Sequence, residues 1–448
     1  MVVMQIEIGM RIKPAEASQP TPSETYDFYV ATDGDDGAAG TTEAPFSSLT
    51  RLASAMKVAA SGTTQTALVR TGAYTDDQFN PFTAGRSGVR IELTFEKGCT
   101  LAGGIKTERG YNSGINASNG GIIVVQGNGL IISGYASGSG NGISASGDGE
   151  IYVYDCTVED CVDGFSLHNT AYGEIHRCTL RRCTKDAVVH VDATVSKQCD
   201  CTIIGHESVG QSGPVISFNS AGRHEMHRCV FIPQFSNDKL VLRDVSSGRY
   251  NVYLKDCVLG TLTTAFVLSV EHERPGLVVE DSFVHVQSDA HEPHVMRRCW
   301  GYYSIRHRDG GKGPVVLDSC IFGGPSAIAG KSSAFYASYN PGAGSPVMFI
   351  DTVLTGYATA IGDMGPVASR QAIDAGFSMS HCLLYANIID FDADFAAADG
   401  FAAAVNNNFI GDPLLGSMNK TDKSAWGYQP GSTCIGAGSD GGNIGFSA

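Results

Sequence analysis

The middle of the chain gathers side chains suited to acid–base chemistry and to holding an acidic ligand. Eleven of the 12 histidines fall between His168 and His307. Several stand with arginines and carboxylates near the ends of strand-like runs, at His168, His190, Asp192, Arg243, 271–274 (Glu-His-Glu-Arg) and 306–309 (Arg-His-Arg-Asp). On a chain with a formal net charge of −15, a local row of arginines and histidines predicts a site for an acidic sugar chain.

Elimination beside a uronate carboxylate is one chemistry that these residues could perform. It needs a base to remove the proton and a cation to neutralise the carboxylate. Arg306, Arg308 or Lys312 could supply the cation, and His272 or His307 could act as the base.

Glycoside hydrolysis is the second chemistry. It needs two carboxylates about 5 Å apart for retention, or about 6.5–9.5 Å apart for inversion. The candidates are Asp192, Glu271, Glu273 and Asp309. Across both chemistries, the catalytic candidates are Arg306, His307, Arg308, Glu271 and His272.

The same region could instead bind a saccharide without cleaving it. The candidate binding residues are His168, His190, Asp192, Arg243, Arg274, Lys312, Trp300 and Tyr303. Aromatic faces can stack on sugar rings, but they also pack in cores and between subunits. The charged residues could equally pair between neighbouring strands as surface ion pairs, each worth about 0–1 kcal/mol.

A repeat of short strands must position these residues. Five similar strand-like pieces span 151–161, 174–183, 197–205, 224–233 and 250–260. Their alignment places Cys156, Cys178, Cys201, Cys229 and Cys257 in one column, with spacings of 22, 23, 28 and 28 residues. The column continues through Ser282, Ser319 or Cys320, Thr352 and Cys382. This period predicts a solenoid of stacked coils.

A second strand follows each cysteine-column strand. This series covers 164–169, 187–192, 214–219, 239–244, 265–270, 302–309 and 334–340. We therefore expect His168, His190, Arg243 and Arg306 to line one flank of the solenoid. Loops at 271–276, 308–313 and 340–346 should protrude from one corner, which is often the binding face of a solenoid.

The N-terminal region should start and cover the solenoid. Residues 1–25 predict a strand and a Pro/Ser/Thr-rich linker, serving either as a docking arm or as a cap on the open end. From Ser47, apolar residues recur at helical spacing, which predicts a short amphipathic helix with a serine N-cap and a stop at Gly62.

The stretch 29–56 followed by 67–76 resembles the opening of pectate-lyase-like right-handed parallel β-helices, and 406–415 with 427–448 is similar to their closing segment. The resemblance implies an all-β fold, a three-sheet solenoid of about 10–13 coils with an N-terminal helix cap. It implies a cap over 26–66, a β-helix over 67–410 and a closing segment over 411–448. Clustered aspartates like the calcium site of pectate lyases, and the paired-Asp motifs of polygalacturonase-like hydrolases, are missing from the sequence.

The composition limits the kinds of partner that we expect the chain to bind. The negative charge argues against nucleic acid, and no apolar run is long enough for a membrane span. The 13 cysteines lack metal-ligand spacing, so we expect buried reduced thiols and folding in a reducing cytoplasm. We expect no cofactor, because the Asp-Gly-Asp-Asp-Gly turn at 33–37 has Gly37 and Ala44 where a calcium loop needs oxygen ligands.

Two functions follow from these observations. The first is a phage tail component, a tailspike or tail-fibre-like protein that contacts and could degrade host polysaccharide. It would be a homotrimer in the virion and would join other tail proteins through residues 1–25. The alternative is a secreted or periplasmic polysaccharide lyase or glycoside hydrolase. A structural spike protein without sugar contact is a third possibility.

Overall fold

The computed structural model describes most of the chain from residue 25 onward. The described residues are 25–57, 60–75, 77–81, 88–103, 113–136, 140–192, 194–206, 214–220, 222–235, 238–242, 251–261, 264–270, 276–288, 294–307, 314–323, 333–337, 346–363, 366–385, 387, 389–410, 412–415, 428–429, 432, 434–435, 437–439 and 443–445. The arm and linker predicted for 1–25 therefore lie almost entirely outside the described residues.

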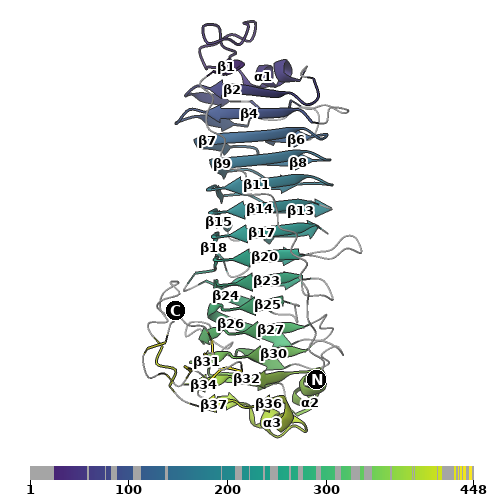
Figure 1. Cartoon of the computed structure of the whole chain (residues 1–448), viewed down its shortest axis with the longest axis vertical. Coiled ribbons are helices and arrows are strands. Elements are labelled where there is room, and N and C mark those ends of the chain that lie inside the picture. The colour runs from purple at the N-terminus through teal and green to yellow at the C-terminus, as the bar shows by residue number, and fades with distance from the viewer. Residues whose placement is uncertain are drawn as a thin grey trace.

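The strands wind into a tall solenoid with three sheets, and the strands of sheet A face the viewer in Figure 1. Sheet A contains β1 (Phe28–Val30), β2 (Thr64–Val69), β4 (Arg90–Phe95), the starts of β7 (Ile122–Ser133) and β9 (Glu150–Glu159), β11 (Tyr172–His176), β14 (Val195–Cys199), β17 (Arg223–His227), β20 (Asn251–Lys255), β23 (Leu277–Glu280), β25 (His294–Arg297), β27 (Val315–Asp318), β30 (Val347–Ile350), β33 (Ser378–Ser380) and β36 (Val405–Asn406).

Sheet B continues each coil around a corner. It contains β3 (Ala73–Thr75), β5 (Thr100–Ala102), the ends of β7 and β9, β12 (Thr179–Arg181), β15 (Thr202–Ile204), β18 (Val230–Ile232), β21 (Val258–Leu259), the starts of β24 (Phe283–Ser288) and β26 (Trp300–His307), β28 (Ile321–Gly323), β31 (Val353–Thr355), β34 (Leu383–Tyr385) and β37 (Phe409–Ile410).

Sheet C completes the coil. It contains β6 (Ser113–Ser118), β8 (Asn141–Ser146), β10 (Asp163–Leu167), β13 (Asp186–Asp192), β16 (Pro214–Ser220), β19 (Lys239–Leu242), β22 (Phe266–Val270), the ends of β24 and β26, β29 (Phe335–Ala337), β32 (Thr359–Asp363) and β35 (Ile389–Phe391). Successive coils pair in parallel, as β11 does with β14 and β10 with β13. The predicted three-sheet solenoid and its second strand series are confirmed.

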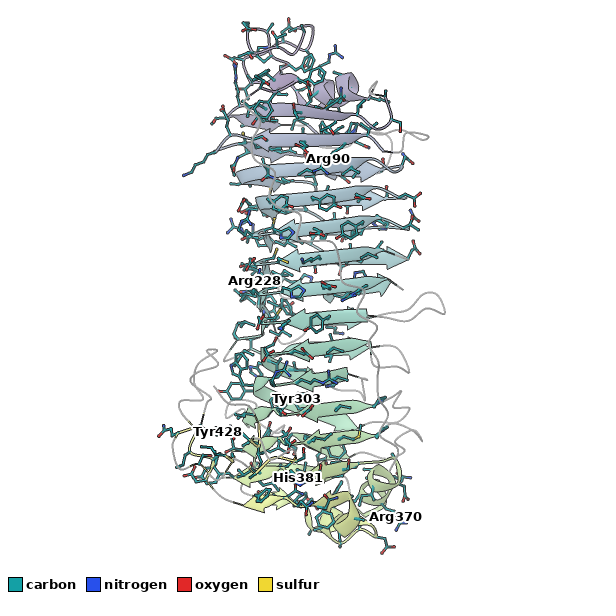
Figure 2. The ribbon with its side chains drawn as sticks, in the orientation of Figure 1. Arg90, Arg228, Tyr303, Arg370, His381 and Tyr428 are labelled. Carbon is teal, nitrogen blue, oxygen red and sulfur yellow. The ribbon has the colours of Figure 1, made fainter. Side chains whose placement is uncertain are left out.

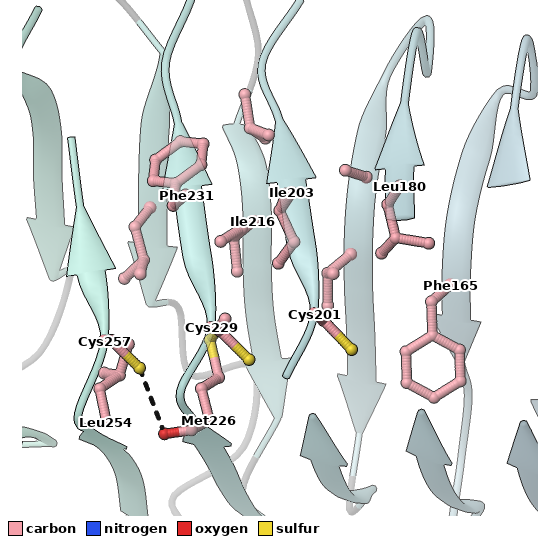
Figure 3. Packing of buried hydrophobic residues seen from close by; sticks show 14 of the residues in the cluster. Phe165, Leu180, Cys201, Ile203, Ile216, Met226, Cys229, Phe231, Leu254 and Cys257 are labelled. Carbon is pink, nitrogen blue, oxygen red and sulfur yellow. Dashed lines mark hydrogen bonds between the residues drawn. The ribbon is translucent and has the colours of Figure 1, made fainter. Parts of the chain in front are cut away.

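Side chains alternate between the interior and the exterior of the solenoid, as the pleat of a strand requires. In β4, the fully buried Ile91, Leu93 and Phe95 alternate with partly exposed residues. The inward side chains of all three sheets meet in one continuous apolar core, part of which Figure 3 shows around Ile216 and Phe231.

The cysteine column lies inside the solenoid, at the start of sheet B. The strand register stacks Cys156, Cys178, Cys201, Cys229 and Cys257 on successive coils, which confirms the predicted alignment. Further along, the column contains Cys320 rather than Ser319, and it also contains Cys299, which the sequence reading missed. All 13 cysteines are free and buried.

Each column side chain is a small hydrogen-bond donor. The Cys229 thiol donates to the backbone oxygens of Gln198 and His227, at 3.5 and 3.4 Å. The Thr352 hydroxyl donates in the same way to two backbone oxygens, at 3.1 and 2.8 Å. Cysteine, serine and threonine therefore suit a position that is narrow and lined by carbonyl groups.

The residue before each column position turns the chain from sheet A to sheet B. It adopts a left-handed backbone, with φ of 56° at Asp155, 52° at Arg177, 56° at Asp200 and 51° at Arg228. Arg228 lies at the edge of the front sheet in Figure 2. This corner therefore presents a vertical row of short turns that carry charged side chains.

Helices lie at both ends of the solenoid (Figure 1). The predicted N-terminal helix is confirmed as α1 (Leu49–Met56), with Ser48 as its N-cap, although it ends before the predicted stop at Gly62. The carboxylate of Asp77 accepts bonds from the backbone amides of Leu49 and Thr50, at 2.6 and 2.9 Å. At the other end lie α2 (Pro366–Asp374), α3 (Ala393–Ala396) and α4 (Phe401–Ala404).

The closing segment covers part of the outer face of sheet B. In the later coils this face carries an apolar row, Phe283, Trp300, Ile321, Val353 and Leu383, which packs with Cys434 and Ile444 in a second buried cluster. The Asp351 carboxylate accepts bonds from the Ser439 amide and hydroxyl, at 2.7 and 2.5 Å, and so fastens the segment.

Candidate functional site

The outer face of sheet A carries polar and aromatic side chains on five neighbouring coils. Some are half-buried, as Tyr152 and His176 are, and others are nearly buried, with Glu174 8%, Glu225 7% and Tyr154 3% exposed. We define the polar face as the outward side chains of β9, β11, β14, β17 and β20. Their polar and aromatic members among the described side chains are Glu150, Tyr152, Tyr154, Tyr172, Glu174, His176, Lys197, Arg223, Glu225, His227, Tyr253 and Lys255. Because these positions alternate with inward residues and the coils are in register, they form vertical columns, and neighbouring residues within a column lie about 4.8 Å apart.

Glu174 is held by both outward neighbours on its own strand. His176 Nε2 lies 3.0 Å from the Glu174 carboxylate, and the Tyr172 hydroxyl donates to the same group. Burial works to raise the pKa of Glu174, but these two hydrogen bonds outweigh it and the pKa is lowered. Glu174 is therefore an ionised acceptor near neutral pH.

Glu225 repeats this arrangement two coils further on. Its carboxylate lies 2.8 Å from Arg223 Nε and 3.2 Å from His227 Nε2. Lys197 stands between Glu174 and Glu225 in the register of the sheet. The two carboxylates are thus held among cations and donors, rather than facing each other across a gap for an attacking water.

Aromatic rings lie beside the carboxylates. The rings of Tyr152 and Tyr172 are 5.6 Å apart, and Tyr154 stacks on His176 at 4.9 Å. The Tyr152 hydroxyl donates to Glu150 at 2.9 Å, which fixes the ring on the face. The half-buried Tyr152 and Tyr172 therefore offer ring surface beside oriented donors and acceptors, whereas Tyr154 is only 3% exposed.

At the corner beside the polar face, charged side chains form ion pairs with one another. Arg177 binds Asp155 through two bonds of 2.7 and 2.8 Å, and Arg228 binds Asp200 in the same way at 2.6 and 2.9 Å. The Arg177 guanidinium also lies over the Tyr154 ring, 5.8 Å from its centre. These pairs join one coil to the next along the corner.

Most of the catalytic candidates cannot be placed. Arg308, Glu271 and His272 lie outside the described residues, as do the binding candidates Arg243, Arg274 and Lys312. Arg306 and His307 lie on β26, where only their backbone is described. The roles assigned to these eight residues remain predictions.

His168 and Asp192 lie near the end of their strands, as the sequence reading predicted. His168 is half-buried with Nε2 2.7 Å from the Ser166 hydroxyl, and burial lowers its pKa, which favours the neutral ring. Asp192 is exposed, and its carboxylate accepts a 3.3 Å bond from the Asn169 amide.

Three predicted binding residues are corrected by their burial. His190 is fully buried, with its ring edge-to-face against Phe165 and tilted against Phe218, because it lies one position away from the outward row of its strand. Tyr303 is 1% exposed and bonds to His294 at 2.8 Å inside the core. Trp300 points outward but is 6% exposed beneath the closing segment. None of the three can contact a saccharide in this structure.

The polar face was not predicted from the sequence, although the sequence contains a pattern that marks it. The stretches Tyr-Gly-Glu-Ile-His at 172–176 and Arg-His-Glu-Met-His at 223–227 share a glutamate and a histidine at matching outward positions. Both stretches end two residues before a column cysteine, so the repeat that revealed the fold also contained this pattern.

The fold places the chain in a known class. Residues 84–233 match the family described as the right handed beta helix region. With the parallel stacking above, this match shows that the chain has the right-handed parallel β-helix fold, which the resemblance to pectate-lyase-like proteins predicted.

Solved structures of the same fold include XylC in complex with xylose, at 10% identity and a TM-score of 0.45 over 87% of each chain. Pectate lyase Pel9A has 14% identity and a TM-score of 0.35 over 92% of this chain and 91% of that one. The tailspike protein gp49 from Acinetobacter baumannii bacteriophage Fri1, a capsular polysaccharide depolymerase, has 10% identity and a TM-score of 0.35 over 90% and 63%. A comparison with curated proteins gives no match.

Two features are absent from the described residues. No helix among them is long and apolar enough to cross a membrane. Nor do they contain a group of three or more His, Cys, Asp or Glu side chains placed to hold a metal ion.

Proposed function

We propose that the polar face binds a polysaccharide. The carrying observation is the recurrence of ring surfaces and held carboxylates along one sheet, with Glu150 and Tyr152 on β9, Tyr172 and Glu174 on β11, and Glu225 on β17. A saccharide offers hydroxyl groups, which ionised carboxylates accept, and apolar ring faces, which tyrosine rings can cover. Because the array repeats along the solenoid axis, it suits an extended polymer better than a single small molecule.

Binding fits this face better than cleavage does. A general acid needs a pKa raised towards neutrality, whereas the pKa of Glu174 is lowered. Lys197 occupies the position between Glu174 and Glu225, where an inverting mechanism would need room for water. We therefore assign the polar face to recognition.

We further propose that the chain is a tailspike or tail-fibre-like component of a phage tail, homotrimeric and located in the virion. Thirteen free, buried thiols support this proposal, because such a chain suits assembly in a reducing host cytoplasm. Docking to other tail proteins would fall to residues 1–25. A secreted lyase or hydrolase acting through 271–274 and 306–312 is the alternative that the experiment below must separate.

Native gels cast with capsular and plant polysaccharides test the proposed binding. We expect retarded migration in at least one polymer, without loss of polymer length. Unsaturated product, followed by its ultraviolet absorbance, would favour the lyase alternative. A monomeric mass in solution would contradict the tailspike proposal.

A further inference from the structure

A hollow opens at the corner between sheets A and B, beside the polar face. Its volume is about 750 Å³, and we call it the corner hollow. It is lined by Lys97, Asn128, Gly129, Asp155, Cys156, Thr157, Arg177 and Thr179. Volumes of about 300–1,000 Å³ are usual for sites that bind small molecules.

A bulge in β7 creates the corner hollow. Gln126 pairs with Tyr154 and Leu130 pairs with Cys156, so three residues of β7 lie opposite Asp155 alone. In the coils that follow, a single left-handed residue makes the same turn, as Arg177 does. Bulges of this kind often lie next to functional sites, because they redirect the chain locally.

The bulge is held in place rather than loose. Asn128 and Gly129 adopt left-handed conformations, with φ of 49° and 88°. The Asn128 side-chain amide donates to the Phe95 carbonyl at 2.7 Å, which ties the bulge to the coil before it. A side chain built at Gly129 would meet nothing within 4 Å, so the space in front of this residue is open.

The lining offers both donors and acceptors, with two cations, Lys97 and Arg177, and one carboxylate, Asp155. Asp155 and Arg177 form a bidentate pair and remain 31% and 44% exposed, so a ligand can reach them. Each Asp155 oxygen accepts one bond from Arg177 and retains a lone pair for a ligand hydroxyl. Thr157 and Thr179 add hydroxyls side by side on the outer row of sheet B.

We propose that the corner hollow binds one neutral sugar residue of the polysaccharide through a pair of neighbouring hydroxyls. This inference rests on the proposed binding at the polar face. Arg177 belongs to the hollow and also covers Tyr154 of the polar face, so the two surfaces are continuous. The substrate is therefore a branched neutral polysaccharide, whose backbone follows the polar face and whose side residue enters the hollow. The paired Asp155 and Arg177 carry no net charge together, which suits the hydroxyl groups of a neutral sugar, and Lys97 can donate to a further oxygen.

The test uses two matched variants. Thr157→Tyr fills the corner hollow. Thr202→Tyr makes the same change in the same outer row, on a coil whose threonine does not line the hollow. Circular dichroism and thermal melting confirm that both variants fold.

Saturation-transfer NMR with free galactose, mannose, glucose and glucuronate measures binding to the hollow directly. We expect a signal from a neutral sugar in the full chain and in Thr202→Tyr, and its loss in Thr157→Tyr. A signal from glucuronate alone, an unchanged signal in Thr157→Tyr, or no signal overturns the proposal for the hollow.

Gel retardation separates this proposal from the proposed function. In galactomannan, Thr157→Tyr should bind about tenfold more weakly than the full chain, since it loses roughly two hydrogen bonds. In unbranched mannan the two should bind equally. Retardation that depends on Tyr172 but not on Thr157 would refute the hollow and leave the polar face standing. If no polysaccharide retards the full chain, the proposed function itself fails.

Discussion

The imidazole of His176 lies 3.0 Å from the carboxylate of Glu174, two residues before it on the same strand. Glu225 and His227 have the same relationship at 3.2 Å, two coils away. The solenoid thus presents the same Glu–His unit twice on one face, because the coils are in register and strand residues alternate sides. Predictions about this unit and about the core that carries it follow from the geometry.

Glu174 should make part of the stability depend on acid pH. Its folded-state pKa lies below the ordinary value of 4.5, so its contribution is fully present above pH 4.5 and is lost as the pH falls through the folded value. Glu174→Gln should therefore narrow the gap between the melting temperatures at pH 7 and pH 3. An unchanged gap would mean that the hydrogen bonds from His176 and Tyr172 do not stabilise the ionised form.

The buried pair of His206 and Asp238 should give the opposite trend. Its side chains are 3% and 1% exposed, Nδ1 of His206 lies 2.9 Å from the carboxylate, and this bond raises the pKa of His206 above 6.5. The stabilisation is fully present below pH 6.5 and is lost as the pH rises through the folded value. Breaking such a pair costs about 3–5 kcal/mol.

Melting curves of His206→Gln and the full chain between pH 5.5 and 9 check this prediction. The difference between them should shrink as the pH rises. His168→Gln is the control: burial lowers the pKa of His168, so its ionisation cannot produce the same trend. A constant difference for His206→Gln would show that His206 is not charged in the folded protein.

The cysteine column should tolerate small residues and reject large ones. Cys229→Ser should cost less than about 1.5 kcal/mol, since Ser282 and Thr352 already occupy the same column. Cys229→Arg should prevent folding, because it places an unpaired charge and excess volume in the core. Soluble yield and melting temperature measure both effects. Equal behaviour of the two variants would contradict the stacked arrangement.

Thiol titration provides a second check on the core. All 13 thiols are buried, and burial raises the pKa of Cys161 to about 12. A disulfide reagent should therefore react with few or no thiols in the native chain and with 13 in denaturant. Rapid reaction of several thiols in the native state would show that the column is accessible.

The sequence predicted the parts of the fold that depend on the repeat. The column from Cys156 to Cys257, the second strand series and the helix after Ser48 all follow from spacing and local propensity. Cys299 was missed because it lies 17 residues after Ser282, whereas the earlier spacings were 22 to 28. A solenoid can lose a loop from one coil without losing its register, and a search for a fixed period does not detect that coil.

The candidate site was harder to predict, because the side of the sheet that a strand residue faces changes at every position along the strand. His190 lies one residue from an outward position, and a shift of one residue reverses the side that a strand residue faces. Trp300 does face outward, but its cover comes from residues more than 130 positions later, Cys434 and Ile444. The spacing of residues in the sequence does not reveal a contact between positions so far apart.

The most direct measurement is the affinity of the polar face for the polysaccharide that retards the full chain. The double variant Tyr172→Ala, Glu174→Gln removes a ring and the charge of one unit. Arg181→Ala removes an exposed ion pair with Glu159 from sheet B and serves as the control. By isothermal titration, we expect the double variant to bind at least about tenfold more weakly, having lost a ring contact and charged hydrogen bonds, and the control to bind as the full chain does. Equal affinity of all three proteins would contradict recognition by the polar face.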